Sequence, residues 1–222
     1  FIPALIFHAM SGEEFRLLDY GALALGGALV VLLSGLIAWG VARAMGIDWR
    51  TLVPPMMFVN SGNMGLPLAL LAFGESMLPA AEVLFLLENL LHFTLGVRML
   101  DRRASLLALL RIPMIQATLA GLAVALLGLR VPGPLAVAVE MLGQVAIPLM
   151  LFALGVRLND ANLEHWRIGL LGALLRPLSG LAVALAVLPW LGLTGAQSQL
   201  LLLFAVLPPA VLNYMIAERY AQ

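Results

Sequence analysis

The stretch that decides the fold runs from Pro54 to Glu75 and reads PPMMFVNSGNMGLPLALLAFGE. It has the length and apolar flanks of a membrane span, yet its middle holds the polar, helix-breaking run Asn60-Ser61-Gly62-Asn63. A bilayer core has no water to hydrogen-bond loose backbone, so a helix broken at this depth must lie inside protein or beside a cavity. Broken helices of this kind hold the substrate in many secondary transporters.

The composition is that of a polytopic membrane protein. Of the 222 residues, 63% are hydrophobic and 11% are charged, against about 45–50% apolar and 25% charged in an average soluble domain. Twelve basic residues balance twelve acidic ones and form no basic block, so nucleic acid is not expected as a partner. There is no Cys and the three His are scattered, so neither a metal site nor a cofactor is expected.

Charged and turn-forming clusters divide the chain into eight apolar segments, and a full span needs about 20 residues. These segments are 1–11, 17–44, 54–75, 77–100, 105–129, 135–156, 166–191 and 196–217. The first is short and reads as the tail of a truncated helix, so we expect the chain to be a fragment. Arg residues gather in alternate loops, which predicts that those loops face the cytoplasm.

Short sequence matches predict an internal repeat in this all-α protein. Ile2-Pro3 matches Ile147-Pro148, Ser34-Gly35-Leu36 matches Ser179-Gly180-Leu181, and Pro54-Pro55 followed by Asn60 matches Pro208-Pro209 followed by Asn213. The matching segments are an odd number of spans apart, so the two copies have opposite orientations in the membrane. We therefore expect an inverted repeat of five-helix units with two broken crossover helices. Repeat one (1–100) lacks its first helix and repeat two (104–222) its last, which leaves eight helices of ten.

Three motifs resemble the auxin efflux carrier family, in its bacterial permease branch. They are NSGNMGLP at Asn60–Pro67, AIPLMLFALGVRL at Ala146–Leu158 and LPPAVLNYMIAERY at Leu207–Tyr220. The resemblance covers essentially the whole chain. It implies a fold similar to bile-acid sodium symporters and sodium–proton antiporters, and an organic anion such as auxin or malonate as cargo.

The resemblance also implies two kinds of domain. The scaffold-like part would be 1–12 with 104–157, and the transport-like part 17–100 with 165–222, where the two broken helices cross. A homodimer would form through the scaffold helices. Plant members have a Pro-Asn pair at the first crossover where this chain has Val59-Asn60, and tend to have Pro in place of Asn213. Auxin itself is therefore less expected as cargo than another carboxylate.

The candidate substrate site lies between the two breaks. Amide groups there, with the N-termini of two half-helices, would favour a carboxylate without a formal positive charge. The residues expected to bind substrate are Asn60, Ser61, Asn63, Asn213 and Arg176; those expected to shape the crossover are Gly62, Gly65, Pro67, Pro208 and Pro209. Alternatively, the Asn side chains only satisfy backbone groups freed by the breaks, and Arg176 snorkels to the membrane surface.

Glu88 and His92 form a second polar group inside a span. They are four residues apart and would share one helix face, where they could take up and release a proton. A structural hydrogen bond between helices explains them equally well. Glu82 and Glu140 lie near predicted span ends and are expected to be solvated.

These observations predict a secondary transporter that moves a small organic anion by alternating access. The rival functions are a cation-coupled symporter or sodium–proton antiporter of the same fold, and a membrane receptor that transports nothing. No paired Asp, nucleophilic Ser element or HExxH motif occurs, so we do not expect an enzyme.

Overall fold

The computed structural model describes residues 1–11, 17–100, 111, 113–159, 166–210 and 213, and these are almost all helical. The helices are α1 (Ile2–Met10), α2 (Gly21–Met45), α3 (Trp49–Met57), α4 (Leu66–Phe73), α5 (Leu78–Leu91), α6 (Val97–Leu100), α7 (Pro113–Leu126), α8 (Gly133–Asn159), α9 (Trp166–Leu191) and α10 (Gly195–Ala205). Two π-helical turns, η2 (Ser61–Gly65) and η4 (His92–Gly96), and two 3-10 turns, η1 (Leu17–Tyr20) and η3 (Glu75–Met77), join or extend them. The all-α prediction is confirmed.

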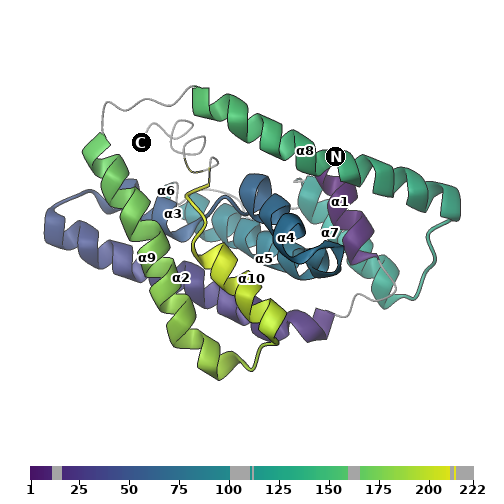
Figure 1. The fold of residues 1–222 in the computed structure, drawn as a ribbon, viewed down its shortest axis with the longest axis horizontal. Coiled ribbons are helices and arrows are strands. Elements are labelled where there is room, and N and C mark those ends of the chain that lie inside the picture. Colours follow the sequence, from purple (N-terminus) through teal and green to yellow (C-terminus); the bar gives the residue numbers. More distant parts are fainter. Residues whose placement is uncertain (12–16, 101–110, 112, 160–165, 211–212, 214–222) are drawn as a thin grey trace.

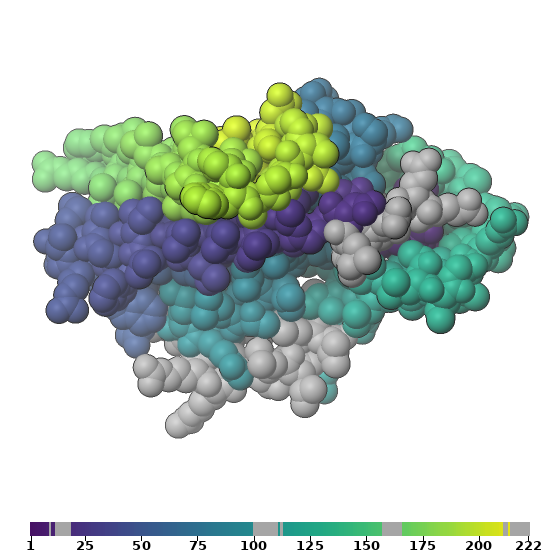
Figure 2. All heavy atoms as spheres, turned by 90° about the horizontal axis from the view of Figure 1, so that it is seen from below, coloured from purple at the N-terminus to yellow at the C-terminus, as the bar shows by residue number. Residues whose placement is uncertain are grey.

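The helices pack in two groups. Helix α1 lies against α7 and α8, whereas α2 lies against α3, α5, α9 and α10 (Figures 1 and 2). The turn η2 and helix α4 contact α8, and α1 contacts α5, so these elements connect the groups. The division of the chain into scaffold-like and transport-like parts stays a prediction.

Among the described residues, four helical stretches are long and apolar enough to cross a membrane. They are Gly21–Met45, Glu75–Met99, Gly133–Val156 and Trp166–Leu191. The apolar helices Ser61–Phe73, Pro113–Leu126 and Gly195–Ala205 are shorter. Two of the short helices, Ser61–Phe73 and Gly195–Ala205, adjoin places where a helix is interrupted. This arrangement is expected for half-helices inside a membrane bundle.

Small residues allow α2 to pack closely on its neighbours. A Cβ added at Gly27 would lie 2.7 Å from a methyl group of Leu84, and one at Gly35 would lie 2.5 Å from Cγ of Met57. Helix association in lipid depends on such close packing, because lipid tails are as apolar as the side chains. Gly46, with φ of +66°, ends α2 in the left-handed conformation that favours glycine.

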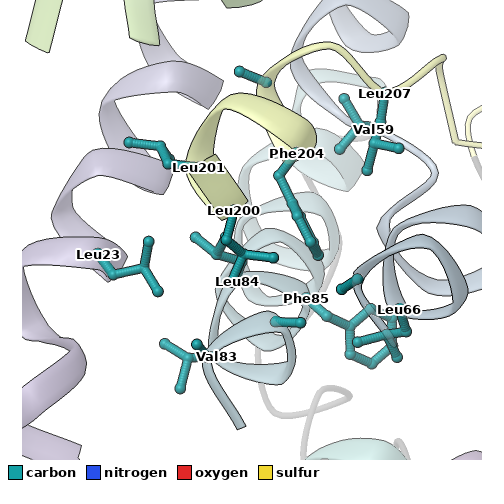
Figure 3. Close-up of a cluster of buried hydrophobic side chains, with 14 of the residues drawn as sticks. Leu23, Val59, Leu66, Val83, Leu84, Phe85, Leu200, Leu201, Phe204 and Leu207 are labelled. Carbon is teal, nitrogen blue, oxygen red and sulfur yellow. The ribbon is translucent and has the colours of Figure 1, made fainter. Parts of the chain in front are cut away.

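The central part of the largest buried cluster lies between α2, α4, α5 and α10, and the cluster also has members in α1, α8 and α9. Its members shown in Figure 3 are Leu23, Val59, Leu66, Val83, Leu84, Phe85, Leu200, Leu201, Phe204 and Leu207. Phe204 and Leu207 come from the end of α10 and the residues just after it, and Val59 comes from the chain after α3. The core of the bundle therefore surrounds the two places where a helix is interrupted.

The helix before the first break begins earlier than the predicted segment 54–75. Helix α3 begins at Trp49 because the Asp48 carboxylate caps it, accepting a hydrogen bond from the Arg50 backbone N–H at 3.0 Å. Pro54 and Pro55 consequently lie inside α3, and the chain leaves the helix only at Phe58. In the proposed match, Pro54 and Pro55 are therefore helical, whereas Pro208 and Pro209 lie outside any helix. The inverted repeat itself stays a prediction.

Candidate functional site

The two interrupted segments cross and pair with each other. Val59 and Pro209 form an isolated antiparallel β-bridge. The Asn60 N–H donates to the Pro208 carbonyl at 2.8 Å, and the Ala210 N–H donates to the Phe58 carbonyl at 2.9 Å. Pro209 fits at the bridge position because the two bonds use its neighbours and require no N–H from Pro209 itself. The crossing of the two breaks thus satisfies backbone groups that no helix serves.

Asn213 reinforces the crossing from the second break. Its Nδ2 donates to the Phe58 carbonyl at 2.9 Å, so this one oxygen accepts hydrogen bonds from both Ala210 and Asn213. The Asn213 Oδ1 is buried and lacks a partner at full hydrogen-bonding geometry within the described part of the chain. The His92 side chain lies close to the Asn213 side chain. The amide therefore supports the Phe58 backbone through Nδ2 and also lies beside His92.

Asn60 is placed at the start of the half-helix that follows the first break. The residue is 6% exposed, and its carbonyl accepts hydrogen bonds from the N–H groups of Met64 at 3.2 Å and Gly65 at 3.0 Å. These bonds open the π-helical turn η2, which runs directly into α4. Single π turns in helices are often found at functional sites.

The residues predicted to shape the crossover lie where the structure requires a small side chain or tolerates a Pro. An added Cβ at Gly62 would lie 2.9 Å from the Phe85 ring, and one at Gly65 would lie 2.9 Å from Leu207. Pro67 lies in the first turn of α4, where its missing N–H costs nothing. Pro208 supplies the carbonyl that anchors Asn60.

Asn63 lies on the side of the half-helix that faces α1 and α8. It lines a groove of about 360 Å³ with seven apolar residues: Phe1, Ile2, Pro3, Ala146, Leu149, Met150 and Ala153. This volume lies within the range of about 300–1,000 Å³ that small-molecule sites occupy. Ser61 lies at the crossing instead, with 3% of its surface exposed.

Glu88 and His92 have different neighbours, although sequence spacing predicts that they act together. The Glu88 carboxyl lies near Ser61, the Val59 backbone and Arg176. His92 stacks on the Phe58 ring, with the ring centroids 4.1 Å apart and the planes 4° from parallel. Each side chain thus contacts a different part of the crossing, Glu88 at the start of the half-helix and His92 at the last residues before the break.

Arg176 lies deep in the bundle. It is 1% exposed, which excludes snorkelling to the surface, and its Nη1 donates to the Ala205 carbonyl at 3.2 Å. Ala205 is the last residue of α10, where a positive charge is favourable at the negative end of the helix dipole.

Glu82 is also buried, at 0% exposure, so the expectation that it is solvated is wrong: it lies on the inner face of α5.

Comparison with known proteins agrees with this geometry. A family model described as "Membrane transport protein" matches residues 102–221. The chain is 31% identical over 248 aligned positions to a Rhizobium meliloti (strain 1021) protein named "Putative malonate transporter". This alignment covers 99% of the chain and 74% of the relative. The chain belongs to the auxin efflux carrier family of membrane transport proteins. No solved structure matches it. As a member of this family, with four helices able to span a bilayer, it is an integral membrane protein.

Several residues at the crossing of this family member were missed by the sequence analysis. The Phe58 carbonyl accepts a hydrogen bond from Ala210 of the second break, and the Phe58 ring stacks on His92. Gly180 lets the end of α10 approach α9. The matched Ser-Gly-Leu motif was the one signal that drew attention to Gly180. Within the described residues, no group of three or more His, Asp and Glu side chains lies close enough to hold a metal ion.

A disulfide can test the crossing, because the 222 residues contain no Cys. Val59 and Pro209 are a non-hydrogen-bonded antiparallel pair, whose Cα atoms lie about 4.5 Å apart, within the range of about 4.4–6.8 Å for a disulfide. We expect Val59→Cys with Pro209→Cys to cross-link rapidly on mild oxidation, measured by mobility after the chain is cut between α6 and α7. The pair Val59→Cys with Val206→Cys is the control; equal rates for the two pairs would contradict the bridge.

Proposed function

We propose that this chain is the core of a secondary carrier that moves a small organic anion across the membrane by alternating access. The observation that carries the proposal is the crossing of two unwound segments, paired through Val59 and Pro209, inside a bundle of apolar helices. Unwound backbone at this depth is tolerated only where protein or a cavity surrounds it. In secondary transporters such crossings are where substrate and coupling ions bind.

The first break has the chemistry to bind a carboxylate. Asn60 and Asn63 bring amide donors to the start of the Ser61–Phe73 helix, where the first N–H groups and the dipole favour an anion. The apolar groove beside Asn63 would receive the rest of a small acid. We propose malonate or an auxin-like acid as the class of cargo. Malonate is the substrate that the name of the Rhizobium relative gives.

Movement would involve residues 17–100 and 165–222, which contain both breaks, against a scaffold of 1–12 and 104–157. The Arg-rich loops would face the cytoplasm of a bacterial inner membrane, and scaffold helices of two copies would form a homodimer. Catalysis has no part in this function. Uptake measurements separate it from its rivals, because a receptor would bind the acid without moving it and a sodium–proton antiporter would not require it.

The test is uptake of labelled carboxylates, malonate first, by the full-length protein in proteoliposomes. We expect Asn60→Ala to lose tenfold or more of the uptake rate, since a hydrogen bond to a charged group contributes about 1.5–3 kcal/mol. Asn213→Ala should also lose uptake, because it removes the hydrogen bond from Nδ2 to the Phe58 carbonyl that supports the crossing. Asn89→Ala is the matched control, because Asn89 donates to the Phe85 carbonyl in its own helix, at 2.8 Å. Well-folded Asn60 and Asn213 variants that move carboxylates at the wild-type rate would refute the proposed site.

A further inference from the structure

Glu88 of α5 and Arg176 of α9 face the same small cavity beside the crossing. The cavity leaves about 20 Å³ for the centre of a water molecule, and its lining also includes Val59 of the first break and Ala205 of the second. Space of this size holds about one ordered water, provided that polar groups surround it. Glu88 is 5% exposed and Arg176 is 1% exposed. Neither side chain can therefore be solvated by bulk water.

Both side chains have buried polar atoms without a direct hydrogen-bond partner among the described residues. Within the described part of the chain, the Arg176 Nε and both Glu88 carboxylate oxygens lack a partner at full hydrogen-bonding geometry. The Ser61 side chain and the Val59 backbone lie close to the Glu88 carboxylate. The two groups interact electrostatically without a direct hydrogen bond. A lone buried charge in a membrane protein is costly, and such charges are normally compensated by a partner.

We propose that Glu88 and Arg176 form a water-bridged ion pair that ties the two breaks together and leaves the crossing without net charge. Arg176 holds the end of α10 through the Ala205 carbonyl. Glu88 lies beside Ser61, the first residue of the half-helix after the other break. The pair therefore spans from one break to the other, and any movement of the crossing carries both charges together.

Other charged groups near Glu88 do not compete for this role. The lining that α2 contributes is Gly27, Val30 and Val31, which cannot titrate. From α10 come Leu201, Phe204 and Ala205, which are likewise uncharged. His92, one turn further along, stacks on Phe58, and Glu82 does not line the cavity. Among the described lining residues, Glu88 and Arg176 are the two that titrate.

The ion pair predicts a different defect for each partner. This part rests on the proposed carrier function, because it is read out in uptake. Glu88→Gln leaves a buried positive charge, so the voltage dependence of uptake should differ from that of the wild type by up to one charge; one charge moving through a full 100 mV changes an equilibrium by up to about fifty-fold. Arg176→Gln leaves a carboxylate that can protonate, so its uptake should fall as pH rises and the unpaired group ionises.

The double variant Glu88→Gln/Arg176→Gln removes both charges. It should show neither the altered voltage dependence of Glu88→Gln nor the added pH dependence of Arg176→Gln, and its uptake should recover relative to Glu88→Gln. Arg176→Lys keeps the positive charge and should gain no pH dependence, which covers the case in which Arg176→Gln does not fold. Matched controls are Glu82→Gln, a buried Glu of the same helix, and Arg167→Gln, an exposed Arg of α9.

Thermal unfolding in detergent tests the pair without transport. Each single variant should lower the unfolding temperature, and the double variant should lose clearly less than the two losses added together. Additive losses would overturn the pair. So would a Glu88→Gln variant that flattens the wild-type pH profile while Arg176→Gln leaves it unchanged, since Glu88 would then carry the coupling proton predicted with His92. Wild-type protein that moves no carboxylate would refute the carrier function, while the unfolding experiment still decides on the pair.

Discussion

Gly180→Ala should produce one of the two largest losses of stability and transport of any single substitution in this chain. A Cβ at position 180 would collide with the carbonyl oxygen of Ala205 and with Nη1 of Arg176, and would lie 2.9 Å from the Ala205 carbonyl carbon. Two of these three atoms belong to backbone at the end of α10, so they cannot rotate away as a flexible side chain would. Moving them would break the Arg176–Ala205 hydrogen bond and displace the second break.

Overpacking a well-filled core typically costs about 1–3 kcal/mol, and we expect Gly180→Ala to reach or exceed the top of that range. Its unfolding temperature in detergent should fall sharply, and uptake should be lost with it. Gly169→Ala is the matched control, because Gly169 lies in the same helix and an added Cβ there meets nothing within 4 Å. Similar unfolding temperatures for the two variants would show that α9 and α10 do not approach each other at Gly180.

Phe58→Ala should have an effect of similar size. The ring is 0% exposed and stacks on His92, and Gly96 lies against both rings, since a Cβ there would lie 2.8 Å from Cε2 of Phe58. Removing a buried Phe ring from a packed core costs about 3–5 kcal/mol. The loss would also free the backbone whose carbonyl accepts hydrogen bonds from Ala210 and Asn213.

The expected result for Phe58→Ala is a lower unfolding temperature together with loss of uptake. Phe152→Ala, on the exposed face of α8 at 70% exposure, should leave both measurements near the wild-type values. Phe58→Leu fills part of the space and should be intermediate. A folded Phe58→Ala variant that takes up carboxylates normally would mean that the His92–Phe58 stack does not hold the crossing.

Long apolar helices were the most predictable part of this fold. The segment expected at 166–191 is α9, Trp166–Leu191, and the segment expected at 17–44 is η1 followed by α2. Such helices follow from local composition, because a membrane span needs only a sufficient run of apolar residues. The break near Asn60 was also predicted from its polar and Gly residues. The structure interrupts the helix at residues 58–60, and Ser61, Gly62 and Asn63 already belong to the π turn that begins the next half-helix.

Pro residues were less reliable guides. Pro54 and Pro55 lie inside α3, and Pro148 lies inside α8, whereas Pro208 and Pro209 do mark a break. Sequence alone does not separate these cases, because neighbouring elements in a membrane protein can satisfy the backbone groups that a Pro frees. The Asp48 cap, which starts α3 early, was the local signal that could have placed Pro54 correctly.

Partners of the buried polar residues depend on contacts that spacing along one helix cannot show. Glu88 and His92 share a helix, but Glu88 lies near Arg176 and His92 stacks on Phe58, each from a distant part of the chain. The π turn η4 begins at His92, so the regular α-helical spacing that predicts a shared face ends there. Glu82 was expected to be solvated from its distance to the span end, yet tertiary packing buries it completely.

Protection of a single cysteine tests most directly whether a small organic anion binds beside the crossing. Ala153→Cys would place a thiol in the wall of the groove that Asn63 lines, and Ala136→Cys would place one in a separate groove near His8 and Arg130. We predict that malonate or another transported carboxylate slows alkylation of Cys at position 153 several-fold, leaves position 136 unaffected, and loses this effect when Asn60→Ala is added. Equal alkylation rates at position 153 with and without every carboxylate that the protein transports would contradict a site at the crossing.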